Sequence, residues 1–402
     1  MQNKLLRRLN IYSGEVTYTI LLALSSVMLG AFLCSYDLAA HALFFEKWKQ
    51  EDLAMVYLIS GVLGLILFFV YSFLHKRISF KIFHFIIFLL AILLVGFFIG
   101  NYYYSSDTGS FFVLVSMFPV NLLVLLAFWR YQRKVLLPDQ TKRLFPILET
   151  GLVAGIVFMA YSSVIILKSY HHHILIGLSG LFLILFFIYQ FPLNIYHRLN
   201  KQFNHRKENR IPVRSSLFIF LSNKYTRYLL LFALTSAVLG FYLHFGFLNL
   251  SRIRFTEVES FSKFYGLFLG TMFLFLWMVD RFLVRRILYS YDSPYSLVLM
   301  PVGLMVFFVL SIFGTLILRK YIGDNPLTYL IIMFGINKIV YETSHNVIQL
   351  PSLRTLYRTL DIRFLQIIYP RIEGMVVMLG LSVTGGILIG IYKLVTDLQT
   401  GN

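Results

Sequence analysis

Long apolar runs without charge constrain this chain more than any other feature of its sequence. Several runs extend for about 18–25 residues with almost no charge, which is the length a helix needs to cross a hydrocarbon core of about 30 Å. Charged residues make up only 13% of the 402 residues, about half of what a soluble protein carries. The sequence therefore predicts an all-α membrane protein with many spans.

Eleven segments are long and apolar enough to be transmembrane helices. They cover residues 16–41, 52–75, 82–103, 110–130, 144–168, 173–193, 226–250, 259–283, 296–318, 327–349 and 369–392. Six of them precede a long polar segment and five follow it. We expect a first transmembrane half at 1–193, a basic linker at 194–225 and an incomplete second half at 226–402.

Lysine and arginine alternate from loop to loop along the chain. The connections around Lys4, Lys76 and Arg130 are basic, whereas the loop at 101–110 contains neither residue. Basic loops remain in the cytoplasm, so the amino terminus is expected there. Most of the net charge of +18 comes from the lysines and arginines of these basic loops. As a consequence, the loops should attract anionic lipid. We expect the lipid bilayer, and not nucleic acid, to be the partner of this charge.

The sequence also lacks several motifs that carry chemistry. Cys34 is the only cysteine, which excludes a disulfide or a cysteine metal site within one chain. No phosphate-binding loop, dinucleotide fingerprint or nucleophile elbow occurs. We expect no enzymatic activity and no cofactor. Any transport should be secondary, driven by exchange or by an ion gradient.

A short motif is repeated in the two halves. Residues 145–149 read FPILE at the start of span five, and residues 369–373 read YPRIE at the start of span eleven. Proline suits the first turn of a helix, and a glutamate is stabilised there by the positive end of the helix dipole. We therefore expect both motifs to open a helix, at corresponding positions of a six-plus-six repeat.

Glycines are repeated in the two halves as well. Gly61 in span two and Gly266 in span eight each lie fifteen residues before a basic residue. Spans five and eleven each contain a G-x-x-x-G motif, at residues 151–155 and 386–390. Small residues at this spacing let two helices approach closely. We expect close helix contacts at the two G-x-x-x-G motifs.

Six spans, a basic linker and a second set of spans resemble the layout of a major-facilitator transporter, whose halves are related by an axis along the membrane normal. The stretch DRFLVRR at 280–286 resembles a degraded form of the loop signature of that superfamily, without its glycine and with longer spacing. The resemblance implies a bundle of about eleven transmembrane helices here, with a twelfth either missing or, as we favour, beyond Asn402.

Polar side chains inside span ten are the first candidate site. Lys338, Glu342, His345 and Asn346 are spaced by three or four residues and share one stripe of a helix. A charge inside the membrane costs several kcal/mol unless it pairs or faces a wet cavity. We expect the stripe to line a translocation path. The structural alternative is an internal Lys338–Glu342 pair that tolerates burial.

Span one offers a second candidate. Asp37 and His41 are four residues apart toward its outer end, where the pair could relay protons or form an outer gate; solvation at the interface explains them equally well. The run 171–173 contains three histidines, but consecutive side chains diverge and no cysteine or carboxylate is near in sequence. We expect no metal site there.

Five charged residues near the basic boundary are expected to form a cytoplasmic gate. They are Lys142, Arg143, Glu149, Arg371 and Glu373. Two interpretations of the glutamates remain open: helix-start carboxylates paired with cytoplasmic cations, or groups that contact protons or substrate.

Four segments resemble the ATP/ADP translocase family, the nucleotide transporters of plastids and intracellular bacteria. They are QTKRLFPILETG at 140–151, the stretch 37–64, ESFSKFYGLFLGT at 259–271 and PSLRTLYRTLDIRF at 351–364. The resemblance implies the major-facilitator fold, exchange of nucleotides or related solutes, and a bacterial inner membrane. It carries over Arg143 with Lys142 beside it. The family is rich in lysine before span eleven, where this chain has Arg371 alone.

The leading hypothesis is a secondary transporter that moves an anionic organic solute by alternating access, along a path between spans 1–6 and 7–11. A nucleotide is the first candidate solute. One alternative is a transporter-derived scaffold or sensor that anchors a partner protein or a soluble domain beyond Asn402. Another is a lipid or lysophospholipid flippase on the same fold.

Overall fold

The structure, a computed structural model, describes most of the chain. The described residues are 12, 15–77, 80–103, 107–136, 138–199, 224–282, 301–303, 305–306, 309, 313, 326–357 and 362–400. Most of the predicted linker and most of predicted span nine lie outside them. Within the described residues the chain is helical and no strand occurs.

The helices follow the predicted spans closely. They are α2 (Val16–Lys47), α3 (Leu53–Arg77), α4 (Phe80–Tyr103), α5 (Asp107–Val135), α6 (Pro138–Ser169), α7 (Ile174–Leu199), α9 (Lys224–Arg254), α10 (Val258–Phe282), α13 (Pro326–Ser344), α14 (Leu350–Tyr357) and α15 (Ile362–Thr400). A 3-10 turn, η2 (Gln50–Asp52), precedes α3, and a π-helix, η3 (His345–Gln349), follows α13. Among the described residues, eight helices are long and apolar enough to cross a membrane.

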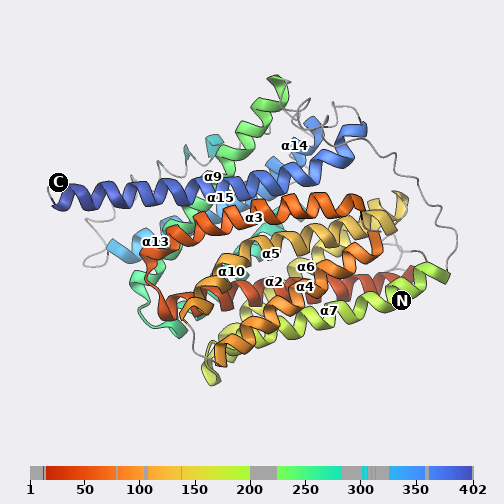
Figure 1. Cartoon of the computed structure of the whole chain (residues 1–402), viewed down its shortest axis with the longest axis horizontal. Coiled ribbons are helices and arrows are strands. Elements are labelled where there is room, and N and C mark those ends of the chain that lie inside the picture. Colours follow the sequence, from red (N-terminus) through yellow and green to blue (C-terminus); the bar gives the residue numbers. More distant parts are fainter. Residues whose placement is uncertain are drawn as a thin grey trace. The chain divides into compact units, whose positions relative to one another are not determined.

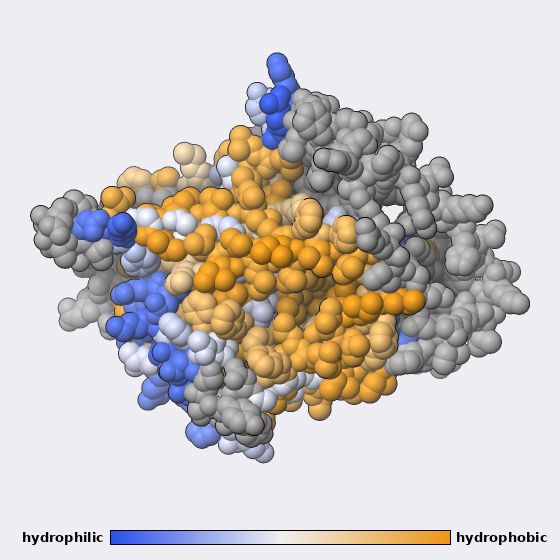
Figure 2. Space-filling view, viewed as in Figure 1, coloured by the Kyte–Doolittle hydropathy of each residue, from blue (hydrophilic) through white to orange (hydrophobic). Residues whose placement is uncertain are grey.

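The exposed faces of these helices are apolar (Figure 2). Phe69 of α3 is 68% exposed, and Leu93 and Phe97 of α4 are 59% and 66% exposed. A soluble protein rarely exposes a contiguous apolar surface of this kind. The same side chains are favourable against lipid, so the protein is a multi-pass integral membrane protein.

The chain forms two compact units. Unit 1 contains Met1–Lys47, Val70–Asn209 and Ser262–Phe273, and unit 2 contains Trp48–Phe69, Arg210–Phe261 and Leu274–Asn402. In unit 1, α2 packs on α5, α6 and α7; in unit 2, α9 packs on α13 and α15 (Figure 1). Most of α3 therefore belongs with the second set of helices, and the middle of α10 with the first. The division at 193 and 226 remains a prediction.

Glycines bring α2 and α6 into close contact. A Cβ added at Gly155 would lie 2.0 Å from the backbone oxygen of Val27, and one at Gly30 would lie 2.0 Å from the backbone oxygen of Leu152. Only glycine allows two backbones to approach this closely. The close contact predicted for the G-x-x-x-G motif of span five is confirmed.

The corresponding prediction for span eleven is wrong. A Cβ at Gly386 or Gly390 would meet no described atom within 4 Å. Helix α15 instead meets α9 at Gly380, where a Cβ would lie 2.7 Å from the Cβ of Ala237, and at Thr384, whose hydroxyl lies 3.3 Å from a backbone oxygen of α9. Gly386 is two residues beyond Thr384, about 200° around the helix, so it lies on another face.

Gly61 and Gly266 make matching contacts in the two units. In unit 2, a Cβ at Gly61 of α3 would lie 2.2 Å from Oγ and 2.5 Å from the backbone nitrogen of Ser382 in α15. In unit 1, a Cβ at Gly266 of α10 would lie 2.5 Å from Oγ of Ser163 in α6. The predicted counterparts thus pack on the counterpart spans eleven and five, as a duplicated architecture requires.

The prediction that the two proline motifs open helices is wrong. Helix α6 begins at Pro138 and α15 begins at Ile362, so Pro146 and Pro370 lie eight residues after the first residue of their helices. Prolines are tolerated inside membrane helices because neighbouring groups can satisfy the freed backbone atoms. Both helices begin several residues before the apolar run. Hydropathy alone therefore placed their first residues too late in the sequence. The equal offset supports the repeat.

Candidate functional site

In unit 1, an acidic cluster joins α2 to α10. The Nδ1 atom of His41 lies 2.8 Å from Oδ1 of Asp37, so the predicted four-residue pair makes contact. The hydroxyl of Tyr265 donates to the same carboxylate, at 3.3 and 3.4 Å from its two oxygens. The His41 side chain is fully buried, whereas 24% of the Asp37 side chain is exposed.

Aromatic rings enclose the buried end of this acidic cluster. The ring centroid of His41 lies 5.2 Å from that of Tyr265 and 6.5 Å from that of Phe118 on α5. At 1.5 Å per residue, Asp37 lies about 15 Å before the last residue of α2. The rings thus enclose the imidazole of His41, while the carboxylate of Asp37 stays partly exposed.

In unit 2, a basic cluster joins α13 to α9. The Nζ atom of Lys338 contacts Nδ1 of His244. The same ammonium lies 5.6 Å from the centroid of the Phe247 ring, within range of a cation–π interaction. Tyr57 of α3 stacks on His244 with ring centroids 6.3 Å apart. Lys338 is 3% exposed and lies about 18 Å from the start of α13.

Further polar contacts hold the end of α13 and η3 against α9. The hydroxyl of Tyr341 donates to the backbone oxygen of Ser236 at 2.8 Å. The side-chain oxygen of Gln349 accepts from the Ser236 hydroxyl at 2.8 Å and lies 2.8 Å from Nδ1 of His345. These bonds satisfy polar groups that would otherwise be costly in an apolar environment.

The predicted stripe of span ten therefore divides into two rows. Lys338 contacts α9 directly, and His345 contacts Gln349, which is bonded to Ser236 of α9. Asn346 is exposed and Glu342 is half-buried. The side chain of Asn346 donates to the backbone oxygen of Glu342 at 2.8 Å and to its carboxylate at 3.3 Å. His244 of the neighbouring helix α9 contacts the amino group of Lys338. The buried lysine therefore does not depend on Glu342 alone for a polar partner. The two rows are separated by about 100° at most.

Of the five predicted gate residues, Arg143 has the best-defined surroundings. Its guanidinium lies 3.1 Å from Oε2 of Glu15 and 4.2 Å from the ring centroid of Tyr12, and Gln140 donates to Glu15 at 2.7 Å. Burial raises the pKa of Glu15, but the hydrogen bonds from Gln140 and Arg143 and the charge of Arg143 outweigh it, so that pKa is lowered. This network ties the start of α2 to the first turns of α6.

The other predicted gate residues lie on α6 and α15. Glu149 is exposed on α6, eleven residues after its first residue, and Glu373 lies eleven residues after the first residue of α15. Neither is a helix-start carboxylate. Lys142 lies in α6, and Arg371 lies in α15. The side chains of Lys142, Arg371 and Glu373 lie outside the described part of the chain.

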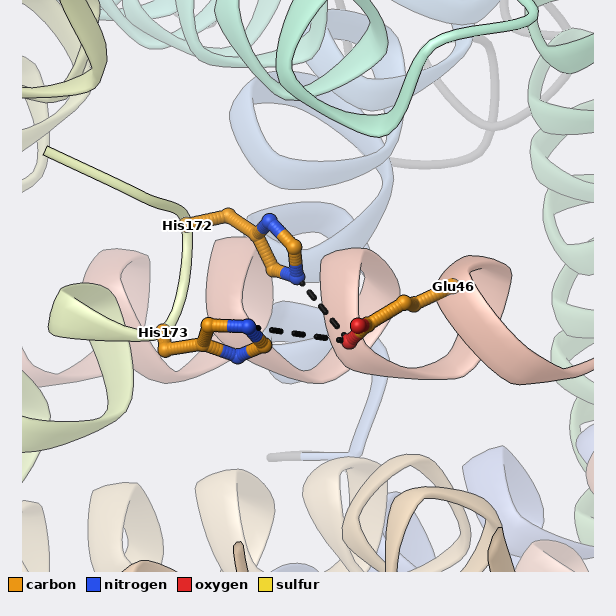
Figure 3. A group of neighbouring side chains, drawn as sticks. All are labelled: Glu46, His172 and His173. Atoms are coloured by element: carbon orange, nitrogen blue, oxygen red, sulfur yellow. Dashed lines mark hydrogen bonds and ion pairs between the residues drawn. The ribbon is translucent and has the colours of Figure 1, made fainter. Parts of the chain in front are cut away.

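The histidine tract differs from its prediction. In the turn between α6 and α7, the side chains of His172 and His173 both point toward Glu46 near the end of α2 (Figure 3). The Nε2 atoms lie 3.1 Å and 3.9 Å from the same carboxylate oxygen. The expectation that consecutive histidines on a loop or helix start diverge is wrong for His172 and His173, because the turn brings both imidazoles to the same carboxylate. The carboxylate is adjacent in space although it is distant in sequence.

Several residues of these clusters were missed by sequence reasoning. His244 lies inside span seven and is, like Lys338 in span ten, an ionisable group in an apolar run. Tyr265 is one of 26 tyrosines, and nothing in its sequence context marks it. Glu15 and Glu46 lie at the two ends of span one, where carboxylates are common at an interface.

The chain has the major-facilitator fold, as its likeness to solved transporter structures shows. A mutant of the nucleoside transporter NupG has a similar structure, with a TM-score of 0.64 and 12% identity over 91% of this chain and 89% of that chain. A second NupG structure has a TM-score of 0.56 with 14% identity over 92% of this chain and 90% of that chain.

A mutant of the E. coli fucose:proton symporter FucP is a further structural neighbour. It has a TM-score of 0.50 and 15% identity over 96% of this chain and 93% of that chain. At these identities the likeness establishes the fold. No protein-family model and no curated protein matches the chain. The resemblance to ATP/ADP translocases remains a prediction.

Proposed function

We propose that the protein is a secondary transporter that moves a small anionic organic solute across the membrane by alternating access. The observation that carries the proposal is the pair of clusters: Asp37 with His41 in unit 1, and Lys338 with His244 in unit 2. An Asp or Lys at the centre of a membrane helix costs about 2.5–3.5 kcal/mol on insertion scales, and such residues usually serve transport or proton movement.

In this proposal the basic cluster of unit 2 binds the solute. A lysine ammonium is a compact charge that suits a phosphate or a carboxylate. His244 and Phe247 contact the amino group of Lys338, and neither side chain can supply a negative charge. Because Lys338 is 3% exposed, the solute would reach it in another conformation of the transport cycle. A nucleotide is the first candidate, from the translocase resemblance; the NupG likeness suggests nucleosides for comparison.

The acidic cluster of unit 1 would couple transport to protons. Asp37 is partly exposed, while His41 and Tyr265 hold its carboxylate from the buried side. Protonation of a carboxylate in a span removes the cost of its charge, which is how such groups bias a conformational equilibrium. FucP is named a fucose:proton symporter, which supports proton coupling as the first mode to test, with solute exchange second.

The test is uptake of labelled nucleotides and nucleosides into liposomes that contain the purified protein. We expect Lys338→Met to lower uptake of the transported anion by about 30-fold or more, because a buried charge contact is worth roughly 2–5 kcal/mol. Lys168→Met is the matched control, since Lys168 is exposed at the end of α6. If the Lys338→Met variant takes up the anion as well as the wild type does, Lys338 does not bind the solute. Folded protein that takes up and binds none of these solutes would contradict the proposed solute class.

A further inference from the structure

A group of three metal-binding side chains lies in unit 1, apart from the acidic cluster. Glu46 comes from α2, and His172 and His173 come from the turn before α7 (Figure 3). We propose that these three residues bind one divalent transition-metal ion, with Zn²⁺ as the ion that fits best. The site is independent of the proposed transport function.

The donor set matches the chemistry of zinc. Two imidazoles and one carboxylate are the protein ligands of a family of zinc sites that keep a fourth position for water. Imidazole also suits nickel, copper and cobalt, whereas magnesium and calcium prefer oxygen. The site is thus selective for a borderline transition metal. Its open fourth position would leave the ion accessible to a small ligand.

The ligand atoms are close to the separation that an ion requires. Zinc bonds of 2.0–2.2 Å in a tetrahedron place neighbouring ligand atoms about 3.3 Å apart. The ligand atoms of Glu46, His172 and His173 lie within 4.8 Å of one another, and the contacts to Oε2 of Glu46 are 3.1 and 3.9 Å. Small side-chain rotations close the difference. Three atoms converge on one point, whereas an ordinary ion pair needs only two.

The surroundings favour a defined site over a flexible tract. The side chains of His172 and His173 are 5% and 19% exposed, while 33% of Glu46 is exposed and gives an ion access from solvent. The imidazole ring centroids are 4.0 Å apart. His171, the first histidine of the tract, is exposed and does not belong to this group.

A bound ion would connect two distant parts of the sequence. Glu46 lies one residue before the end of α2, and the histidines lie 126 and 127 residues later. The ion would fix the end of α2 to the α6–α7 turn within one unit. The predicted topology places this end of α2 opposite the basic loops, so the ion would come from outside the cytoplasm.

Isothermal titration of ZnCl₂ into the full chain, purified in detergent and stripped with a chelator, tests the site. We expect one ion per chain and a rise in melting temperature with zinc concentration. Glu46→Gln, His172→Gln and His173→Gln should each weaken binding by about 100-fold or more, since even outer groups of a metal site contribute 10–100-fold. His171→Gln is the matched control and should bind zinc like the wild type.

Two further measurements keep the test decisive. The melting temperature of each variant without metal shows whether it is folded. Glu46→His replaces an oxygen ligand with a nitrogen ligand, so this variant should still bind zinc. If Glu46 had only a structural role, this retention of zinc binding would not be expected. Wild-type protein that binds no zinc, or a His171→Gln variant as impaired as the other two histidine variants, would overturn the proposal. Neither result depends on any transported solute.

Discussion

The two units hold ionisable side chains of opposite sign, an aspartate in unit 1 and a lysine in unit 2. In unit 1, the carboxylate of Asp37 is held by an imidazole and a phenol and stays partly exposed. In unit 2, the ammonium of Lys338 is held by an imidazole and a phenyl ring and is 3% exposed. The glycine crossings at Gly61 and Gly266 are alike in the two units. The two units are thus alike in these glycine contacts and differ in the polar side chains that they hold.

The largest expected effect comes from breaking the packing of unit 1. A leucine at Gly155 places its Cβ 2.0 Å from a backbone oxygen of α2, which cannot move aside as a side chain could. We expect Gly155→Leu to destabilise the protein by about 3 kcal/mol or more, the upper range for overpacking. Gly386→Leu is the control, because no described atom lies within 4 Å of that position. Thermal unfolding in detergent compares them; equal melting temperatures would contradict the packing.

A smaller effect should come from the hydroxyl of Tyr265 in the acidic cluster. Tyr265→Phe removes the hydrogen bond to Asp37 and leaves the ring in place. Because one such bond contributes about 1–1.5 kcal/mol, we expect pH-gradient-driven uptake to change by roughly 5-fold to 10-fold. Tyr242→Phe, an exposed tyrosine on α9, should leave uptake unchanged. If Tyr265→Phe has no effect, the hydroxyl does not support Asp37.

The smallest effect concerns the link between Glu15 and Arg143. The pKa of Glu15 is lower in the folded protein, so its contribution to stability is present above the unfolded pKa and is lost as pH falls through the folded pKa. The pair is partly exposed, so we expect less than about 1 kcal/mol. Melting temperatures between about pH 3 and 6 should fall less steeply for Glu15→Gln than for wild type. Glu257→Gln, on an exposed side chain, should follow wild type.

Most of the fold was predictable because a long run of apolar residues identifies a membrane-spanning helix. Predicted span 259–283 differs from α10 by one residue at each end. The spacing of glycines was less informative: it identified the contact at 151–155 but failed at 386–390, because spacing does not say which face of a helix meets a neighbour. The first residues of α6 and α15 were missed because each helix already begins in the more polar residues that precede its apolar run.

The candidate sites were predictable only in part. Spacing along one helix placed Asp37 beside His41, a contact that the structure contains. The partners from other helices were not predictable: His244 lies 94 residues before Lys338, and Tyr265 lies 228 residues after Asp37. Such contacts arise from tertiary packing, which a single sequence does not reveal. The group around Glu46 was missed for the same reason.

The most direct test asks whether the acid of unit 1 and the base of unit 2 have separate tasks. Asp37→Asn and Lys338→Met would be compared for solute-induced thermal stabilisation and for uptake driven by a pH gradient, in detergent and in liposomes respectively. We predict that Asp37→Asn still binds the solute but no longer accumulates it, whereas Lys338→Met loses binding. Two variants with the same defect, or Lys338→Met protein that binds as tightly as wild type, would contradict the account.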